Sequence, residues 1–339
     1  MFGGVLITSG LILGAFAPNI GTAYVGLGVL CGAGGGCVLA TSYIVINQYF
    51  KEKRSKAFAI STMGMGIGAL TFAPVLAYWF DAYGYTGALL RNGGLFLNLQ
   101  VAGALMRPPP KGSIIVAEKV EAIDVKDEAK DKSLVDLIKS KASMIKLLTN
   151  PTFMLFCLNV GCATLPSYLT FFPAYALEIG VSTGNSSLIL SANGLADIIG
   201  RLGSGFFFDR VVHGRKRLYH SLVGVAAGLV VASCSLIDSV RSLFGMTMAQ
   251  GFIEGIFSAQ RTVVPFEFVD AKDMSDAVGL IIFAECIGTI VGPLMQGFIK
   301  DSYGSHALGF AIGGMLFCGT SFIMLMDYVI RTIVWRVKH

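Results

Sequence analysis

Apolar stretches of about twenty residues recur along the chain and alternate with polar connections. A helix needs about 20 apolar residues to cross the hydrocarbon core of a bilayer. By that criterion the sequence predicts ten membrane spans, at residues 2–17, 21–48, 56–79, 84–106, 150–178, 186–208, 217–237, 242–268, 276–298 and 307–331. The pattern therefore indicates an all-α membrane protein.

The connections between these spans alternate in charge. One set is short and nearly uncharged, at residues 18–19, 81–85, 178–185, 238–241 and 300–306. The other set is basic and holds 21 of the 26 Lys and Arg residues, at 51–56, 107–149, 210–217, 269–275 and in the tail from Arg331. Lys and Arg concentrate in cytoplasmic connections, so both termini and residues 107–149 are predicted to lie in the cytoplasm.

The polar segment 107–149 divides the predicted spans into four and six. It carries both charge signs and begins close to three consecutive prolines, so we expect a flexible linker with a short amphipathic helix at 133–147. The predicted domains are an N-terminal helical half at 1–106, this cytoplasmic linker, and a C-terminal half at 150–339. Met1 is followed directly by apolar sequence, which favours a chain that begins inside a larger membrane domain.

Composition narrows the class of protein further. The chain is 54% hydrophobic and only 14% charged, whereas a soluble domain carries about 25% charged residues. The seven cysteines lie in apolar segments without metal or disulfide spacing, and the four histidines lie in loops, at helix ends or in the tail. The net charge of +5 is concentrated in connections, so it indicates no nucleic-acid partner. We expect no enzyme activity, no cofactor and no metal site.

Glycine accounts for 42 residues, which is typical of helices that approach one another closely in lipid. Gly28, Gly32 and Gly36 recur four residues apart within one predicted span. This spacing places them on one helix face and predicts a packing surface rather than a phosphate-binding loop.

Charged residues near the middle of the span 186–208 carry the strongest functional signal. A charge at that depth costs from about 2.5 to over 10 kcal/mol and normally faces a partner or a water-filled cavity. Asp197 and Arg201 are four residues apart and therefore share a helix face, together with Asn193 and Gly205. They form either a neutralised ion pair that joins helices or an anion site, because a guanidinium group offers forked donors that match a carboxylate.

Three further charges within predicted spans are candidates for a functional site. Glu254 and Arg261 are seven residues apart on one face, and they serve either as a pair inside the bundle or as part of a translocation path. Glu285 is isolated in its own span. We expect it to be protonated or to pair across helices with Arg201 or Arg261, because an unpaired buried charge is costly.

Several segments resemble the monocarboxylate transporter family of the major facilitator superfamily. They are YFKEKRSKAFAISTMG at 49–64, GYTGALLRNGGLFLNLQVAGALMRPP at 84–109, ADIIGR at 196–201, GFFFDRVVHGRKR at 205–217, PFEF at 265–268 and SDAVGLIIFAECIGTIVGPLMQGFIKD at 275–301. The resemblance covers nearly the whole chain, and the motifs occur in the family's order. It implies a major facilitator bundle with a cytoplasmic central loop.

The resemblance also assigns roles to particular residues. It implies that Arg201 holds the substrate carboxylate, that Asp197 exchanges a proton, and that Phe266 narrows the substrate path. Glu285 matches the family's intramembrane acidic residue, beside Glu254 and Arg261 as path-lining candidates. The junction and loop motifs imply roles in conformational change for Arg54, Gly64, Gly205, Asp209 and Arg210.

The expected function is therefore secondary transport of small monocarboxylates of the lactate and pyruvate class. The resemblance implies symport with a proton across the plasma membrane and a single-span ancillary membrane protein as a partner. The family's first two helices have no counterpart here, nor do their Asp-Gly-Gly-Trp signature and Lys. The alternative is a truncated membrane protein with a partner-binding or regulatory role, and such a chain alone would not catalyse coupled uptake.

Overall fold

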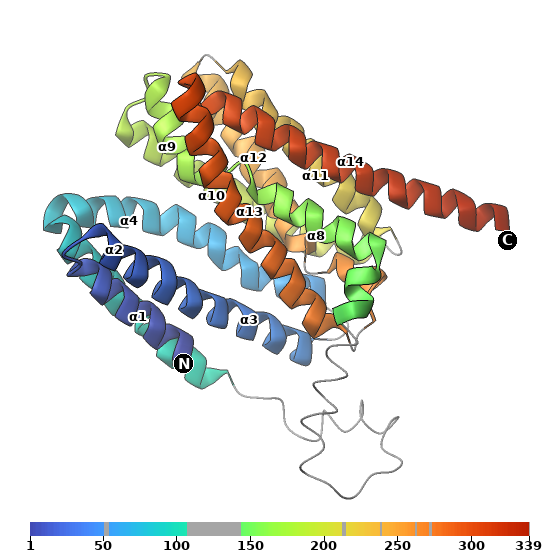
Figure 1. The fold of residues 1–339 in the computed structure, drawn as a ribbon, viewed down its shortest axis with the longest axis horizontal. Helices are drawn as coiled ribbons and strands as arrows, with labels where there is room; N and C mark the ends of the chain where they lie inside the picture. The colour runs from blue at the N-terminus through green and yellow to red at the C-terminus, as the bar shows by residue number, and fades with distance from the viewer. Residues whose placement is uncertain are drawn as a thin grey trace, which may run out of the picture. The chain divides into compact units, whose positions relative to one another are not determined.

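Helices are the only regular elements in the part of the chain that the computed structural model describes (Figure 1). The described residues are 1–50, 54–106, 144–211, 215–237, 239–261, 263–270 and 273–338. The chain divides into two compact units. The first comprises Met1–Arg54 and Pro74–Ala129, and the second comprises Ser55–Ala73 and Lys130–His339.

The first unit is a small helical bundle. Its elements are α1 (Phe2–Ala15), α2 (Ile20–Ala23), the π-helix η1 (Tyr24–Leu30), α3 (Cys31–Tyr49), the later part of α4 (Arg54–Phe96) and α5 (Asn98–Leu105). α1 packs closely on η1 and α3. This close contact requires glycine, because a side chain at Gly26 would collide with the backbone oxygen of Gly10, and one at Gly34 with that of Gly3. No described atom of this unit lies within 4 Å of a side chain placed at residue 28, 32 or 36, so the predicted packing face makes no such contact inside this unit and stays a prediction.

A sharp break divides α4 within the first unit. Gly84 has a φ of +65°, a backbone conformation that other L-residues rarely adopt, and it lies in the predicted connection 81–85. Nearby, the Thr86 hydroxyl donates to the carbonyl oxygen of Ala15 over 3.1 Å. The break lies where the hydropathy pattern predicts a connection, and the division into two consecutive spans stays a prediction.

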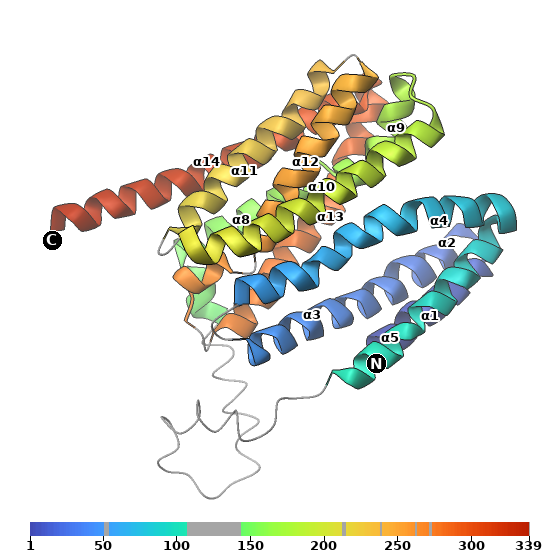
Figure 2. The same ribbon diagram turned by 180° about the vertical axis from the view of Figure 1, so that it is seen from behind.

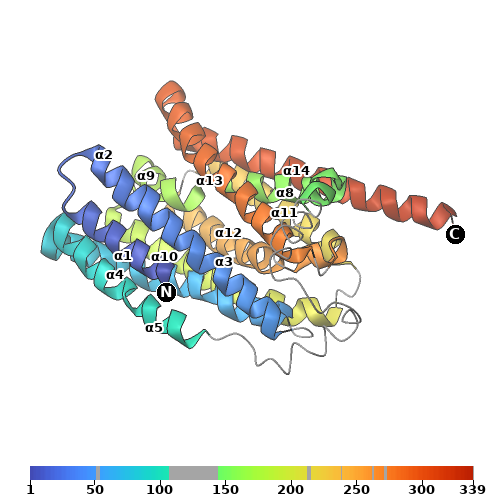
Figure 3. The same ribbon diagram turned by 60° about the horizontal axis from the view of Figure 1, so that its bottom comes forward.

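The second unit holds the six predicted C-terminal spans and residues 55–73 of α4. Its elements are α8 (Pro151–Thr164), α9 (Tyr168–Glu178), α10 (Thr183–Val211), α11 (Lys216–Ala232), η2 (Ser233–Leu236), α12 (Val240–Arg261), η3 (Val264–Glu267), α13 (Met274–Tyr303) and α14 (His306–Lys338). α10 packs on α12, α11 on α14 and α8 on α13 (Figure 2). The last turns of α14 extend beyond the other helices of this unit (Figure 3).

Aromatic residues fill the core of the second unit. Phe153, Phe156 and Phe257 are fully buried, and His220 stacks on Phe257 with ring centroids 4.3 Å apart. His220 therefore belongs to the helical core and not to a helix end, which corrects the sequence-based expectation.

The predicted span 150–178 is broken in the middle, between α8 and α9. Ser167 adopts a left-handed conformation with a φ of 44°, directly after Pro166. The break leaves backbone groups without helical partners, and Gln296 of α13 donates to the carbonyl oxygen of Pro166 over 2.8 Å. Broken membrane helices are tolerated where neighbouring groups satisfy the backbone in this way.

Five helices among the described residues are long and apolar enough to cross a membrane. They are Ile20–Ile46, Pro151–Glu178, Lys216–Leu236, Asp276–Tyr303 and His306–Ile333, and the bent pair Lys56–Phe72 with Pro74–Leu105 would make a sixth. α10 and α12 are not among them. Their charged and amide side chains lower the mean hydropathy, so the two least apolar helices of the second unit are those with a polar face.

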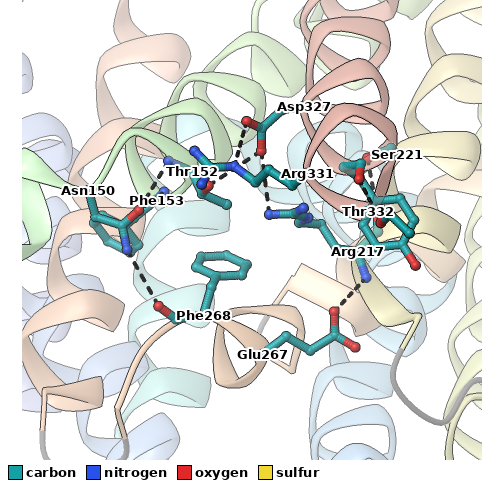
Figure 4. A network of polar contacts seen from close by, with 11 residues as sticks. Asn150, Thr152, Phe153, Arg217, Ser221, Glu267, Phe268, Asp327, Arg331 and Thr332 are labelled. Carbon is teal, nitrogen blue, oxygen red and sulfur yellow. Dashed lines mark hydrogen bonds and ion pairs between the residues drawn. The ribbon is translucent and has the colours of Figure 1, made fainter. Parts of the chain in front are cut away.

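Residues in or next to connections that the charge pattern assigns to one side of the membrane contact one another (Figure 4). Glu267 accepts hydrogen bonds from the backbone nitrogens of Lys216 and Arg217, and Arg217 pairs with Asp327 of α14 over 3.4 Å. At the opposite set of connections, Glu178 pairs with Lys300. This grouping supports the alternation of the connections, whereas the cytoplasmic assignment stays a prediction.

Candidate substrate cavity

A cavity of about 350 Å³ lies within the second unit. It is bounded by the break between α8 and α9, by α10, α12 and α13, and by Met65 of α4. The five intramembrane charges that the sequence analysis selected as site candidates all line it, namely Asp197, Arg201, Glu254, Arg261 and Glu285. Residues from three helices that are distant in sequence therefore meet at one site.

Arg201 and Asp197 form the predicted ion pair on α10. Arg201 Nε lies 2.7 Å from Asp197 Oδ2, and the two residues are 5% and 8% exposed. No group among the described residues accepts a hydrogen bond from Arg201 Nη1. The guanidinium group thus uses one edge to hold Asp197 and keeps a buried donor for another acceptor.

Small residues hold α10 and α12 in close contact beside this pair. Side chains at Gly251 and Gly255 would collide with the carbonyl oxygens of Asn193 and Asp197. Asn193 donates to the carbonyl oxygen of Thr247 over 2.8 Å, which fixes the same interface by a hydrogen bond. The turns that carry Asp197 on α10 and residues 251–255 on α12 therefore lie at one level.

A second ion pair crosses between helices. Arg261 of α12 contacts Glu285 of α13 through Nη1 and Oε1, which settles the expectation that Glu285 pairs with one of the two arginines. Glu254 accepts a hydrogen bond of 3.1 Å from the Ser258 hydroxyl and lies within electrostatic range of Arg201. Unlike Asp197 and Glu285, Glu254 makes no ion-pair contact with a described residue, although Arg201 and Arg261 both lie within electrostatic range of it.

Not every predicted site residue reaches the cavity. Phe266 lies in η3, where it packs against the apolar core around Phe153, and it does not line the cavity. Gly205 is buried on α10 beyond the cavity, and Gly64 lies on α4. Residues 54, 209 and 210 begin α4 or end α10, and the side chains of Arg54, Asp209 and Arg210 fall outside the described part of the chain.

The structure adds polar residues that the sequence reading missed. Gln250 lines the cavity from α12, four residues before Glu254, and this spacing was a signal that could have identified it. Thr164 and Tyr168 line the cavity on either side of the α8–α9 break. Their position depends on that break, which hydropathy alone does not locate.

Comparison with known proteins shows the family. A model of the major facilitator superfamily matches residues 1–293. Monocarboxylate transporter 12 of Rattus norvegicus is 30% identical over 96% of this chain and 70% of its own length. The chain belongs to the monocarboxylate transporter family. Monocarboxylate transporter 13 of Bos taurus, another relative, is 26% identical over 96% of this chain and 72% of its own length.

Solved structures agree on the fold. The E. coli fucose:proton symporter matches with a TM-score of 0.63 at 16% identity, over 96% of this chain and 83% of the symporter. The major facilitator fold expected from the sequence is thereby confirmed, and the chain is a multi-pass membrane protein of a transporter family.

Proposed function

We propose that the protein carries small monocarboxylates of the lactate and pyruvate class together with a proton. The observation that carries this proposal is Arg201, which lines the cavity beside Asp197 and has a buried Nη1 without an acceptor among the described residues. A guanidinium group binds a carboxylate through two parallel hydrogen bonds, and a buried donor without an acceptor is unfavourable until a ligand supplies one. We place this activity at the plasma membrane, in keeping with the sequence-based expectation.

In the proposed mechanism Asp197 and the substrate share the guanidinium group of Arg201. The substrate carboxylate accepts from Nη1, and Asp197 takes up a proton as its hold on Nε weakens. On release of the substrate, Asp197 returns the proton and pairs with Arg201 again. Each carboxylate thus moves with one proton.

The charge of the cavity supports one proton for each anion. Three carboxylates and two guanidinium groups line it. If all of them are ionised, a bound monocarboxylate would bring four negative groups against two positive ones. Uptake of one proton restores the charge of the empty cavity. In a low-dielectric site, binding of the anion without a proton is strongly unfavourable.

Exchange of labelled lactate by the purified protein in liposomes tests the role of Arg201. Arg201→Lys keeps the charge but removes the forked donors, and we expect the initial rate to fall by at least about tenfold, since a hydrogen bond to a charged group contributes about 1.5–3 kcal/mol. Arg331→Lys is the matched control, because Arg331 is exposed and pairs with Asp327 outside the cavity.

Normal exchange by Arg201→Ala, at equal amounts of reconstituted protein, would contradict the proposed role of Arg201. Absence of saturable exchange by the unaltered protein would favour the alternative, a membrane protein that binds a partner without transporting.

A further inference from the structure

One wall of the cavity carries two acceptor side chains that the described residues satisfy only in part. Glu254 receives only the hydroxyl of Ser258, from its own helix, on Oε1. Gln250 is 7% exposed, and its side-chain oxygen has no hydrogen-bond partner among the described residues. The two residues are one helical turn apart on α12, so their side chains form one polar patch facing the cavity.

This patch lies on the helix that packs against the Arg201 site. Gly255, the residue after Glu254, is so close to α10 that a side chain there would meet the backbone nitrogen of Arg201 at 3.0 Å. Glu254 and Arg201 also interact electrostatically. The cavity therefore offers an unused donor on α10 and unused acceptors on α12.

Glu254 is not needed to neutralise either arginine. Asp197 already pairs with Arg201, and Glu285 pairs with Arg261. A half-buried carboxylate beyond those two pairs costs free energy unless a ligand or a proton compensates it. A ligand group that donates hydrogen bonds, and above all a cationic one, would complement it.

We infer that Glu254 and Gln250 form a second subsite that selects carboxylates bearing a hydroxyl or ammonium group near the carboxylate. The inference rests on the proposed function, since Arg201 holds the carboxylate end of the same molecule. It narrows the proposed substrate class to lactate-like acids, because pyruvate has no hydrogen-bond donor at carbon 2. A site built to bind a donor discriminates strongly against an analogue that lacks it, because the protein acceptors then stay unpaired in a buried place. An ammonium group contributes the most binding free energy, since it also compensates the charge of Glu254.

Three acids with one carbon skeleton test this subsite. Propionate, lactate and alanine carry hydrogen, hydroxyl and ammonium at carbon 2. Binding to the full chain purified in detergent is measured as the ligand-dependent rise in unfolding temperature, titrated to a Kd for each acid. We expect lactate and alanine to bind about tenfold more tightly than propionate, a difference of about 1.4 kcal/mol.

Variants of Glu254 and Gln250 test whether these two residues cause the preference for lactate and alanine over propionate. Glu254→Gln should reduce the preference for alanine over propionate to less than about threefold, and Gln250→Leu should weaken lactate and alanine but not propionate. Glu267→Gln is the control, because Glu267 lies in η3 outside the cavity, where it accepts a hydrogen bond from the start of α11, and it should leave all ratios unchanged. If Glu254→Gln does not fold, the Kd values of the three acids for Gln250→Leu and for the unaltered protein still test the subsite.

Equal binding of the three acids to the unaltered protein would overturn the subsite and leave the proposed carboxylate site intact. A preference that persists in both cavity variants would also overturn it. Failure of all three acids to bind would overturn the proposed function and this inference with it.

Discussion

At the scale of residues, the paired charges differ in how far sequence could predict them. Asp197 and Arg201 lie four apart on one helix, so helical geometry alone predicts their contact. Arg261 and Glu285 are on different helices, and only the packing of α12 against α13 brings them together. For Glu285 the sequence left both Arg201 and Arg261 as possible ion-pair partners. The unsatisfied amide of Gln250 depends on tertiary packing in the same way.

The Arg261–Glu285 pair predicts non-additive stability. Arg261→Met leaves a carboxylate without its cation in a membrane cavity and should lower the unfolding temperature clearly, whereas Glu285→Gln added to it should restore part of the loss. A double-mutant cycle on thermal unfolding in detergent should give a coupling free energy of about 1–3 kcal/mol. Strictly additive effects would show that the pair is not formed.

At the scale of elements, close contact between α10 and α12 determines the site. Gly255→Ala should lower the unfolding temperature and weaken lactate binding, because the added methyl group collides with the backbone of α10 at Asp197. Gly245→Ala on the same helix is the matched control, since no atom of another described element lies within 4 Å there. Alanine is favoured over glycine in a helix by about 0.5–1 kcal/mol, so this control should be neutral or stabilising. Equal effects of the two substitutions would argue against the close α10–α12 contact.

Sequence could predict which segments are helices but not which glycines pack. Hydropathy located the spans, and the turn at Gly84 fell within a predicted connection. Glycine spacing identified 28, 32 and 36, yet Gly26 and Gly34 make the contact with α1. Spacing defines a helix face but does not say which face meets a neighbour.

At the scale of the whole molecule, the charge pattern predicts the orientation in the membrane. Intact cells expressing a variant without native cysteines and with Ser113→Cys should not react with an impermeant thiol reagent, because residues 107–149 carry many of the basic residues. Tyr303→Cys, in the opposite set of connections and exposed, should react from outside. Labelling of residue 113 from outside would reverse the orientation.

The central claim is that a carboxylate and a proton move together through the cavity beside Arg201. Accumulation of labelled lactate in liposomes, driven by an imposed proton gradient, tests it most directly. The unaltered protein should concentrate lactate above equilibrium, and a protonophore should abolish the accumulation. Asp197→Asn should still exchange lactate but fail to concentrate it. Accumulation that persists without the gradient, or in Asp197→Asn, would contradict the account.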